Sequence, residues 1–167
     1  MRNTFDRFNG RHQDYQAARP SYAQEFLDWL GELYAPPERY TAADIGSGTG
    51  KLSAQLLAAG FRVCGVEPNP DMRGAAEALL GGDPRFSSSN GTDHDTGLPD
   101  RSVDMVAAAQ AFHWFDGPAF ARECRRILRP GGRAVLVWNV RGSAPMNQAL
   151  AQVFREHCPS FHGFTGG

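Results

Sequence analysis

Short runs of almost entirely apolar residues alternate with segments of helical pattern from residue 40 onward, and this alternation restricts the fold more than any other feature. Strands without polar alternation are covered on both faces, and strands joined by helices run parallel. The sequence therefore predicts an α/β fold with a doubly wound, mostly parallel sheet. The five expected strands are residues 42–45, 62–66, 85–88, 103–109 and 134–138.

Capping residues mark the helices between the expected strands. Gly60 follows a helix at 51–59 in the C′ position, where glycine is favoured. Asn69 is the expected N-cap of a helix that ends before Gly81, with Pro70 in its first turn. Further helices are expected at 118–128 and 143–157, and a turn is expected at 129–132.

The first 39 residues also carry a helical pattern and are expected to form an N-terminal cap or lid. Ser21 is the expected N-cap of a helix in this segment, and Gln24 completes a capping-box pattern. The buried face of this helix is expected to carry Tyr22, Phe26, Trp29, Leu30 and Leu33.

Charge and cysteine content exclude several classes of partner. The 17 basic and 18 acidic residues give a net charge of −1, which argues against nucleic acid or an anionic membrane as a partner. The three cysteines are scattered without a CxxC pair, which indicates reduced thiols and a cytoplasmic protein. A membrane-spanning helix needs about 18 consecutive apolar residues, and the sequence contains no such run.

A glycine-rich turn follows the first expected strand, with Gly46, Gly48 and Gly50 on alternate positions. Glycines at such a turn let a ligand approach the backbone closely, and ligands of open α/β sheets bind at the carboxyl ends of the strands. A phosphate-binding P-loop is excluded because Leu52 stands where that motif needs a hydroxyl. A dinucleotide fingerprint fits Gly46 and Gly48 but would place Lys51 at its third glycine.

Two carboxylates accompany the glycine turn and favour S-adenosylmethionine, which carries an ammonium and a sulfonium group and no phosphate. Asp44, directly before the turn, suits those positive charges and would repel a pyrophosphate. Glu67 ends the second expected strand about twenty residues later, where an acidic side chain can accept both ribose hydroxyls. A nicotinamide dinucleotide, and with it an oxidoreductase, remains the alternative.

Four segments resemble the class I S-adenosylmethionine-dependent methyltransferases and occur in that family's order, at residues 43–50, 65–72, 97–104 and 128–133. The segment 8–22 is similar to the small-molecule subgroup that includes trans-aconitate methyltransferase. The resemblance implies a Rossmann-like cofactor-binding domain at 40–167, one domain with the cap at 1–39. It also implies seven strands, so a chain with five is expected to be C-terminally truncated.

The resemblance implies methyl transfer to a small organic acceptor, with a carboxylate as one candidate. The alternative is a non-catalytic S-adenosylmethionine-binding module. The resemblance places five residues around the methionine part of the cofactor: Asp44, Gly46, Ser47, Gly48 and Gln110. Around the adenosine it places Glu67, Pro68, Met72, Thr92 and Asp93, the last through its backbone.

Candidates for the chemical step follow the fourth strand and precede the first helix. His113 is a candidate general base, or else packs among Phe112, Trp114 and Phe115 as a pocket wall. Tyr15 and Arg19 form a second candidate pair, in which Arg19 could bind a carboxylate with two hydrogen bonds or make a surface ion pair. Residues 93–95 lack the spacing of a metal site, so no metal is expected.

The fifth expected strand would form an edge of the sheet. Residues 134–138 are apolar, and neither a charge nor a proline protects them from pairing with another chain. A fragment, a covering partner chain or an exchange of strands between chains would each explain this edge. Homo-oligomerisation through the fifth strand is therefore an expectation.

Overall fold

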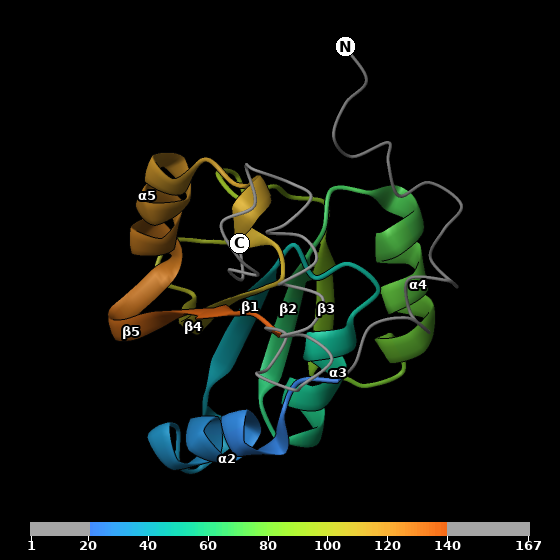
Figure 1. Cartoon of the computed structure of the whole chain (residues 1–167), viewed down its shortest axis with the longest axis vertical. Helices are drawn as coiled ribbons and strands as arrows, with labels where there is room; N and C mark the ends of the chain where they lie inside the picture. Colours follow the sequence, from blue (N-terminus) through green and yellow to red (C-terminus); the bar gives the residue numbers. More distant parts are fainter. Residues whose placement is uncertain (1–20, 140–167) are drawn as a thin grey trace, which may run out of the picture. The chain divides into compact units, whose positions relative to one another are not determined.

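The computed structural model describes residues 21–139, which contain a five-stranded parallel sheet in the order β3-β2-β1-β4-β5 (Figure 1). This arrangement confirms the predicted fold class. The strands are β1 (Thr41–Ile45), β2 (Arg62–Val66), β3 (Phe86–Ser89), β4 (Val103–Ala109) and β5 (Leu128–Val137). The helices are α2 (Gln24–Leu33), α3 (Lys51–Ala58), α4 (Pro70–Leu80) and α5 (Gly117–Ile127), with 3-10 turns η2 (Pro37–Arg39) and η3 (Phe112–Trp114).

The central strands β1, β2 and β4 are largely buried on both faces, as their apolar runs predict, whereas β5 is largely exposed. Ala42 of β1 packs in a cluster with apolar residues of α2 and α3, whereas its neighbour Ala43 packs in a second cluster with residues of α5. Successive side chains of a strand point to opposite faces, so each face needs its own cover. On this alternation Asp44 shares the face of Ala42, toward α3.

The chain divides into two compact units, residues 1–137 and 138–167. The second unit contributes only residues 138 and 139 to the described range, so the five-stranded sheet belongs to the first. Tyr15, Arg19 and the helix expected at 143–157 lie outside the described residues. In the first unit, Leu30 and Tyr34 pack into the same core as Ala42. The boundary at residue 39 stays a prediction.

Two predictions about α2 were wrong. Ser21 does not cap the helix: the N-cap is Ala23, which makes no side-chain capping bond. The side chain of Gln55 in α3 instead bonds both the amide and the carbonyl of Tyr22, each at 3.1 Å. These two bonds hold the backbone of Tyr22 outside the helix, which begins at Gln24. Trp29 is 48% exposed, because the buried stripe of α2 runs through Leu27 and Leu30.

The turn predicted at 129–132 is a bulge within β5. Leu128 already pairs with Val103, and the next pair joins Met105 to Arg133, so four residues of β5 are looped out of the ladder. Gly131 has φ +83 within this bulge, a value that favours glycine. In the described sheet β5 forms an edge, with Leu136 39% exposed.

The long connection between β3 and β4 is fastened to α5. Thr96 donates from its backbone nitrogen and its hydroxyl to Glu123 Oε1, at 2.9 and 2.6 Å. Arg126 binds the same carboxylate, at 2.8 Å to Oε2 and 2.7 Å to Oε1, and reaches Asp100 at 2.7 Å. The Arg126 guanidinium holds the pKa of Glu123 down to about 2. This network keeps residues 90–96 beside the carboxyl ends of the strands.

Strand order places the expected ligand site between β1 and β4. Strands β2 and β3 extend the sheet on one side of β1, and β4 and β5 extend it on the other. The crevice at such a switch point, outside the carboxyl ends of the strands, is the usual binding site of open α/β sheets.

Gly50 provides a test of this local packing. It is the N-cap of α3 with φ +81, and an added Cβ would lie 2.8 Å from Leu80 Cδ1 and 3.1 Å from Ala76 Cβ. We predict that Gly50→Ala lowers the free energy of unfolding by about 2 kcal/mol, through strain and crowding against α4. Urea denaturation measures this change.

Gly74→Ala is the matched control, because Gly74 lies inside α4 with open space around it. There, alanine should raise the free energy of unfolding by about 0.5–1 kcal/mol. Equal stability of the two variants would contradict the packing described for Gly50.

Candidate cofactor site

A cavity of about 190 Å³ lies at the carboxyl ends of the central strands. Its lining comes from Gly46 and Gly48 after β1, from residues after β2 and β3, from Ala109 at the end of β4, and from four residues that follow β4. A smaller cavity of about 40 Å³ shares Gly46, Gly48 and Ala109 with it. The glycine turn therefore separates two adjoining spaces at the predicted switch point.

The turn after β1 needs glycine at two positions. Gly46 has φ +70 and Gly48 has φ +56, a region that other residues rarely adopt. A Cβ on Gly46 would lie 2.8 Å from Ala111 Cβ and 3.3 Å from Phe115 Cζ. The Gly46 and Ser47 amides both donate to the carbonyl of Val66, at 2.8 and 3.1 Å, which fixes the turn against β2.

Glu67 sits at the end of β2 and faces the larger cavity with 9% exposure. The amide of Asn69 donates to Oε1 and the amide of Gly48 donates to Oε2, both at 2.9 Å. Burial raises the pKa of Glu67, and these two amides and the charge of Arg73 partly oppose that rise. Each carboxylate oxygen has a further lone pair, so the group can accept a pair of adjacent hydroxyls.

Asp44 lines the smaller cavity and is 1% exposed. Its Oδ2 accepts a 2.7 Å hydrogen bond from the hydroxyl of Ser53, in the first turn of α3. Burial raises the pKa of Asp44 to about 6, against the lowering effect of the Ser53 hydrogen bonds. Asp44 thus fastens the start of α3 as well as facing the cavity.

The ten residues expected around the cofactor all line one of the two cavities. Asp44 and Ser47 line the smaller, and Gly46 and Gly48 line both. The larger is also lined by Glu67, Pro68, Met72, Thr92, Asp93 and Gln110. Their individual roles toward a cofactor stay predictions.

Asp93 has a structural task that the sequence did not suggest. Its Oδ2 accepts from the amide of Asp116 at 3.0 Å, and its Oδ1 lies 3.0 Å from His94 Nδ1. The side chain therefore ties the loop after β3 to the start of α5, whose N-cap is Asp116. In residues 21–139 no group of three or more potential ligands could hold a metal ion.

His113 is not among the described residues that line either cavity. It is exposed on η3, with its ring centroid 4.9 Å from that of Trp114. The next two side chains, Trp114 and Phe115, line the larger cavity instead. The described geometry gives no support to a base at His113, and that role stays a prediction.

Other lining residues escaped the sequence analysis as ligand candidates. Asn69 was expected only as a helix cap, and it does cap α4 by accepting from the amides of Asp71 and Met72. Lys51 and Tyr22 line the smaller cavity. Tyr22 carried no local signal, because its place depends on how α2 packs against α3.

The model of the methyltransferase domain family matches residues 43–136, more than half of the chain. The chain belongs to this family. S-adenosylmethionine is the cofactor expected of it, so the match favours a methyltransferase over the oxidoreductase alternative. No helix in the described part of this methyltransferase chain is long and apolar enough to cross a membrane.

Two curated relatives and one solved structure illustrate the similarity. An uncharacterized methyltransferase of Mycobacterium tuberculosis is 42% identical over 127 residues, which cover 76% of this chain and 49% of the relative. One of Schizosaccharomyces pombe is 31% identical over 145 residues, covering 86% and 57%. The "Putative Type II Methyltransferase" of Anaeromyxobacter dehalogenans superposes with a TM-score of 0.64 at 35% identity, covering 83% and 57%. The chain spans about half the length of the curated relatives it matches.

The burial of Asp44 predicts a pH-dependent cost in stability. Its pKa rises from 3.8 to about 6 on folding, so the folded state holds a proton that the unfolded state loses between those pH values. Stability from this group therefore falls as pH rises through that window, by up to about 3 kcal/mol. We predict that Asp44→Asn equals the unchanged chain in stability near pH 4 and exceeds it near pH 7.

Urea denaturation of both chains from pH 4 to 7 measures the difference. Glu123 does not disturb it, because the depressed pKa of Glu123 acts equally in both chains and at lower pH. A constant stability difference across the window would show that Asp44 is ionised throughout.

Proposed function

We propose that the protein transfers the methyl group of S-adenosylmethionine to a small organic acceptor. The observation that carries this proposal is the pair of buried carboxylates, Asp44 and Glu67, placed on the two sides of one glycine turn. A cationic amino group and a ribose diol are what such a pair would bind. A pyrophosphate would be repelled by both.

In this proposal the methionine part lies in the smaller cavity, with its ammonium toward Asp44. The ribose hydroxyls donate to Glu67, and the adenine contacts Pro68, Met72 and Thr92. The bound sulfonium supplies a methyl group with a neutral thioether as leaving group. The protein's own residues therefore orient the two reactants and exclude water.

A carboxylate acceptor fits the described lining. A carboxylate is nucleophilic without losing a proton, and no histidine occurs among the lining residues that the structure describes. The similarity of residues 8–22 to the trans-aconitate methyltransferase subgroup supports the same acceptor class.

The remaining expectations about partners and location belong to the same proposal. We expect a cytoplasmic protein without a nucleic-acid or membrane partner, which self-associates through the β5 edge. Light scattering on the purified chain over a range of concentrations tests self-association, and a monomer throughout would reject it.

Cofactor binding to the purified 167-residue chain is the first test. Calorimetric titration with S-adenosylhomocysteine should show micromolar binding, and titration with NADH should show none. Incubation with S-adenosylmethionine and a panel of small carboxylic acids should then release S-adenosylhomocysteine. Binding without turnover on any acceptor would favour the non-catalytic module, and binding of NADH alone would reject both.

Glu67→Gln should weaken the binding of S-adenosylhomocysteine at least about tenfold, because an amide replaces a charged acceptor of two hydrogen bonds. Glu32→Gln is the control, since Glu32 lies exposed on α2 and is not among the residues that line either cavity. Calorimetry compares the two variants. Equal affinities would remove Glu67 from the ribose site.

Binding should also release protons near pH 6. An ammonium beside Asp44 favours its charged form, so the complex should release about half a proton where the pKa of Asp44 is about 6. Affinity should accordingly fall as pH drops below 6. Titrations in two buffers of different ionisation enthalpy measure the release, and Asp44→Asn should reduce it.

A further inference from the structure

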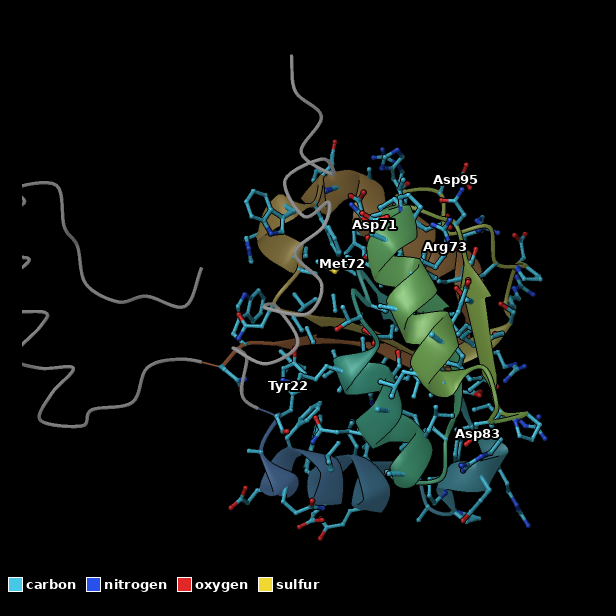
Figure 2. The ribbon with its side chains drawn as sticks, turned by 90° about the vertical axis from the view of Figure 1, so that its right-hand side faces the viewer. Tyr22, Asp71, Met72, Arg73, Asp83 and Asp95 are labelled. Carbon is cyan, nitrogen blue, oxygen red and sulfur yellow. The ribbon has the colours of Figure 1, made fainter. Side chains whose placement is uncertain are left out.

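Arg73 reaches from α4 to the end of β2 and to the loop after β3. Its Nη1 lies 2.7 Å from the carbonyl oxygen of Glu67, 3.3 Å from that of Pro68 and 3.1 Å from Asn90 Oδ1. Figure 2 shows Met72 and Arg73 on opposite sides of the first turns of α4, with Arg73 toward β3. The Arg73 side chain is 19% exposed, so water screens it only in part.

These bonds act on the backbone of the residue whose side chain faces the larger cavity. The Glu67 carboxylate is fixed by the amides of Gly48 and Asn69, and its carbonyl is fixed by Arg73. Rotation at the strand end would break bonds on both sides. Arg73 therefore restricts the direction in which Glu67 presents its carboxylate.

The charge of Arg73 adds a second effect. Its guanidinium favours the ionised form of Glu67, against the burial that disfavours it. Two other groups bear on this balance: Glu77, 3.9 Å from Arg73 Nε on the same helix, and Asp44 of β1, which interacts with Glu67. An ionised carboxylate is the stronger acceptor for hydroxyl groups.

We propose that Arg73 is a positioning residue for the cofactor: Arg73 holds the end of β2 so that Glu67 presents its carboxylate to the ribose. This inference rests on the proposed cofactor function. Arg73 acts through Glu67 and touches neither the methyl group nor the acceptor.

Three variants of the full chain test the proposal: Arg73→Gln, Arg73→Lys and Arg62→Gln. Arg62 lies exposed at the opposite end of β2, so its replacement changes net charge equally without touching the site. The ligands are S-adenosylhomocysteine and 5′-methylthioadenosine, which keeps the ribose and lacks the amino acid. Thermal unfolding shows whether each variant is folded. If Arg73→Gln does not fold, the affinity of Arg73→Lys is compared with that of the unchanged chain instead.

Arg73→Gln should lower the affinity for both ligands about tenfold, as expected for the loss of a charged hydrogen bond, while Arg62→Gln should leave both affinities unchanged. The pH below which 5′-methylthioadenosine affinity falls should move upward in Arg73→Gln, because Glu67 then takes up a proton more readily. Arg73→Lys keeps the charge and should keep the pH profile, with a smaller loss of affinity. A purely structural role would not separate these two variants by pH.

Two results would overturn the proposal in distinguishable ways. Wild-type affinity and pH dependence in folded Arg73→Gln, with Glu67→Gln weakened, would reject the role of Arg73 and leave the cofactor site intact. Failure of the folded unchanged chain to bind S-adenosylhomocysteine would reject the proposed function, and the role of Arg73 with it.

Discussion

The buried carboxylate of Glu67 is the interaction on which the arrangement of the site depends. It accepts one hydrogen bond from the glycine turn after β1 and one from the segment that begins α4. Two loops that belong to different strands are thereby held at a fixed separation. Together with the bonds from the Gly46 and Ser47 amides to Val66, this bridge holds the glycine turn that both cavities share as a wall.

Burying two carboxylates near each other opposes stability. The pKa values of Asp44 and Glu67 are both raised, chiefly by burial, which means that the folded chain holds them as charges at a cost. Their partners, Ser53 and backbone amides, offset part of this cost. A cationic ligand would offset more, which links the stability of this part of the sheet to cofactor binding.

The positions of the strands along the chain and most helix ends could be predicted because they depend on local patterns. Continuous apolar runs require cover on both faces, and Asn69 and Gly60 mark helix ends by their own chemistry. The errors arose where distant residues intervene. Gln55 bonds the backbone of Tyr22 outside α2, and pairing of Leu128 with Val103 makes the turn expected at 129–132 a bulge within β5.

The sequence by itself determined the parallel α/β fold, the glycine turn and the two carboxylates at neighbouring strand ends. Each is written in a few consecutive residues, and a parallel sheet brings its strand ends to one edge. Tertiary structure alone decided that Trp114 and Phe115 line the cavity while His113 is exposed, and that Arg73 reaches the carbonyl of Glu67. Those outcomes depend on side-chain directions set by packing between segments far apart in the chain, which no local pattern records.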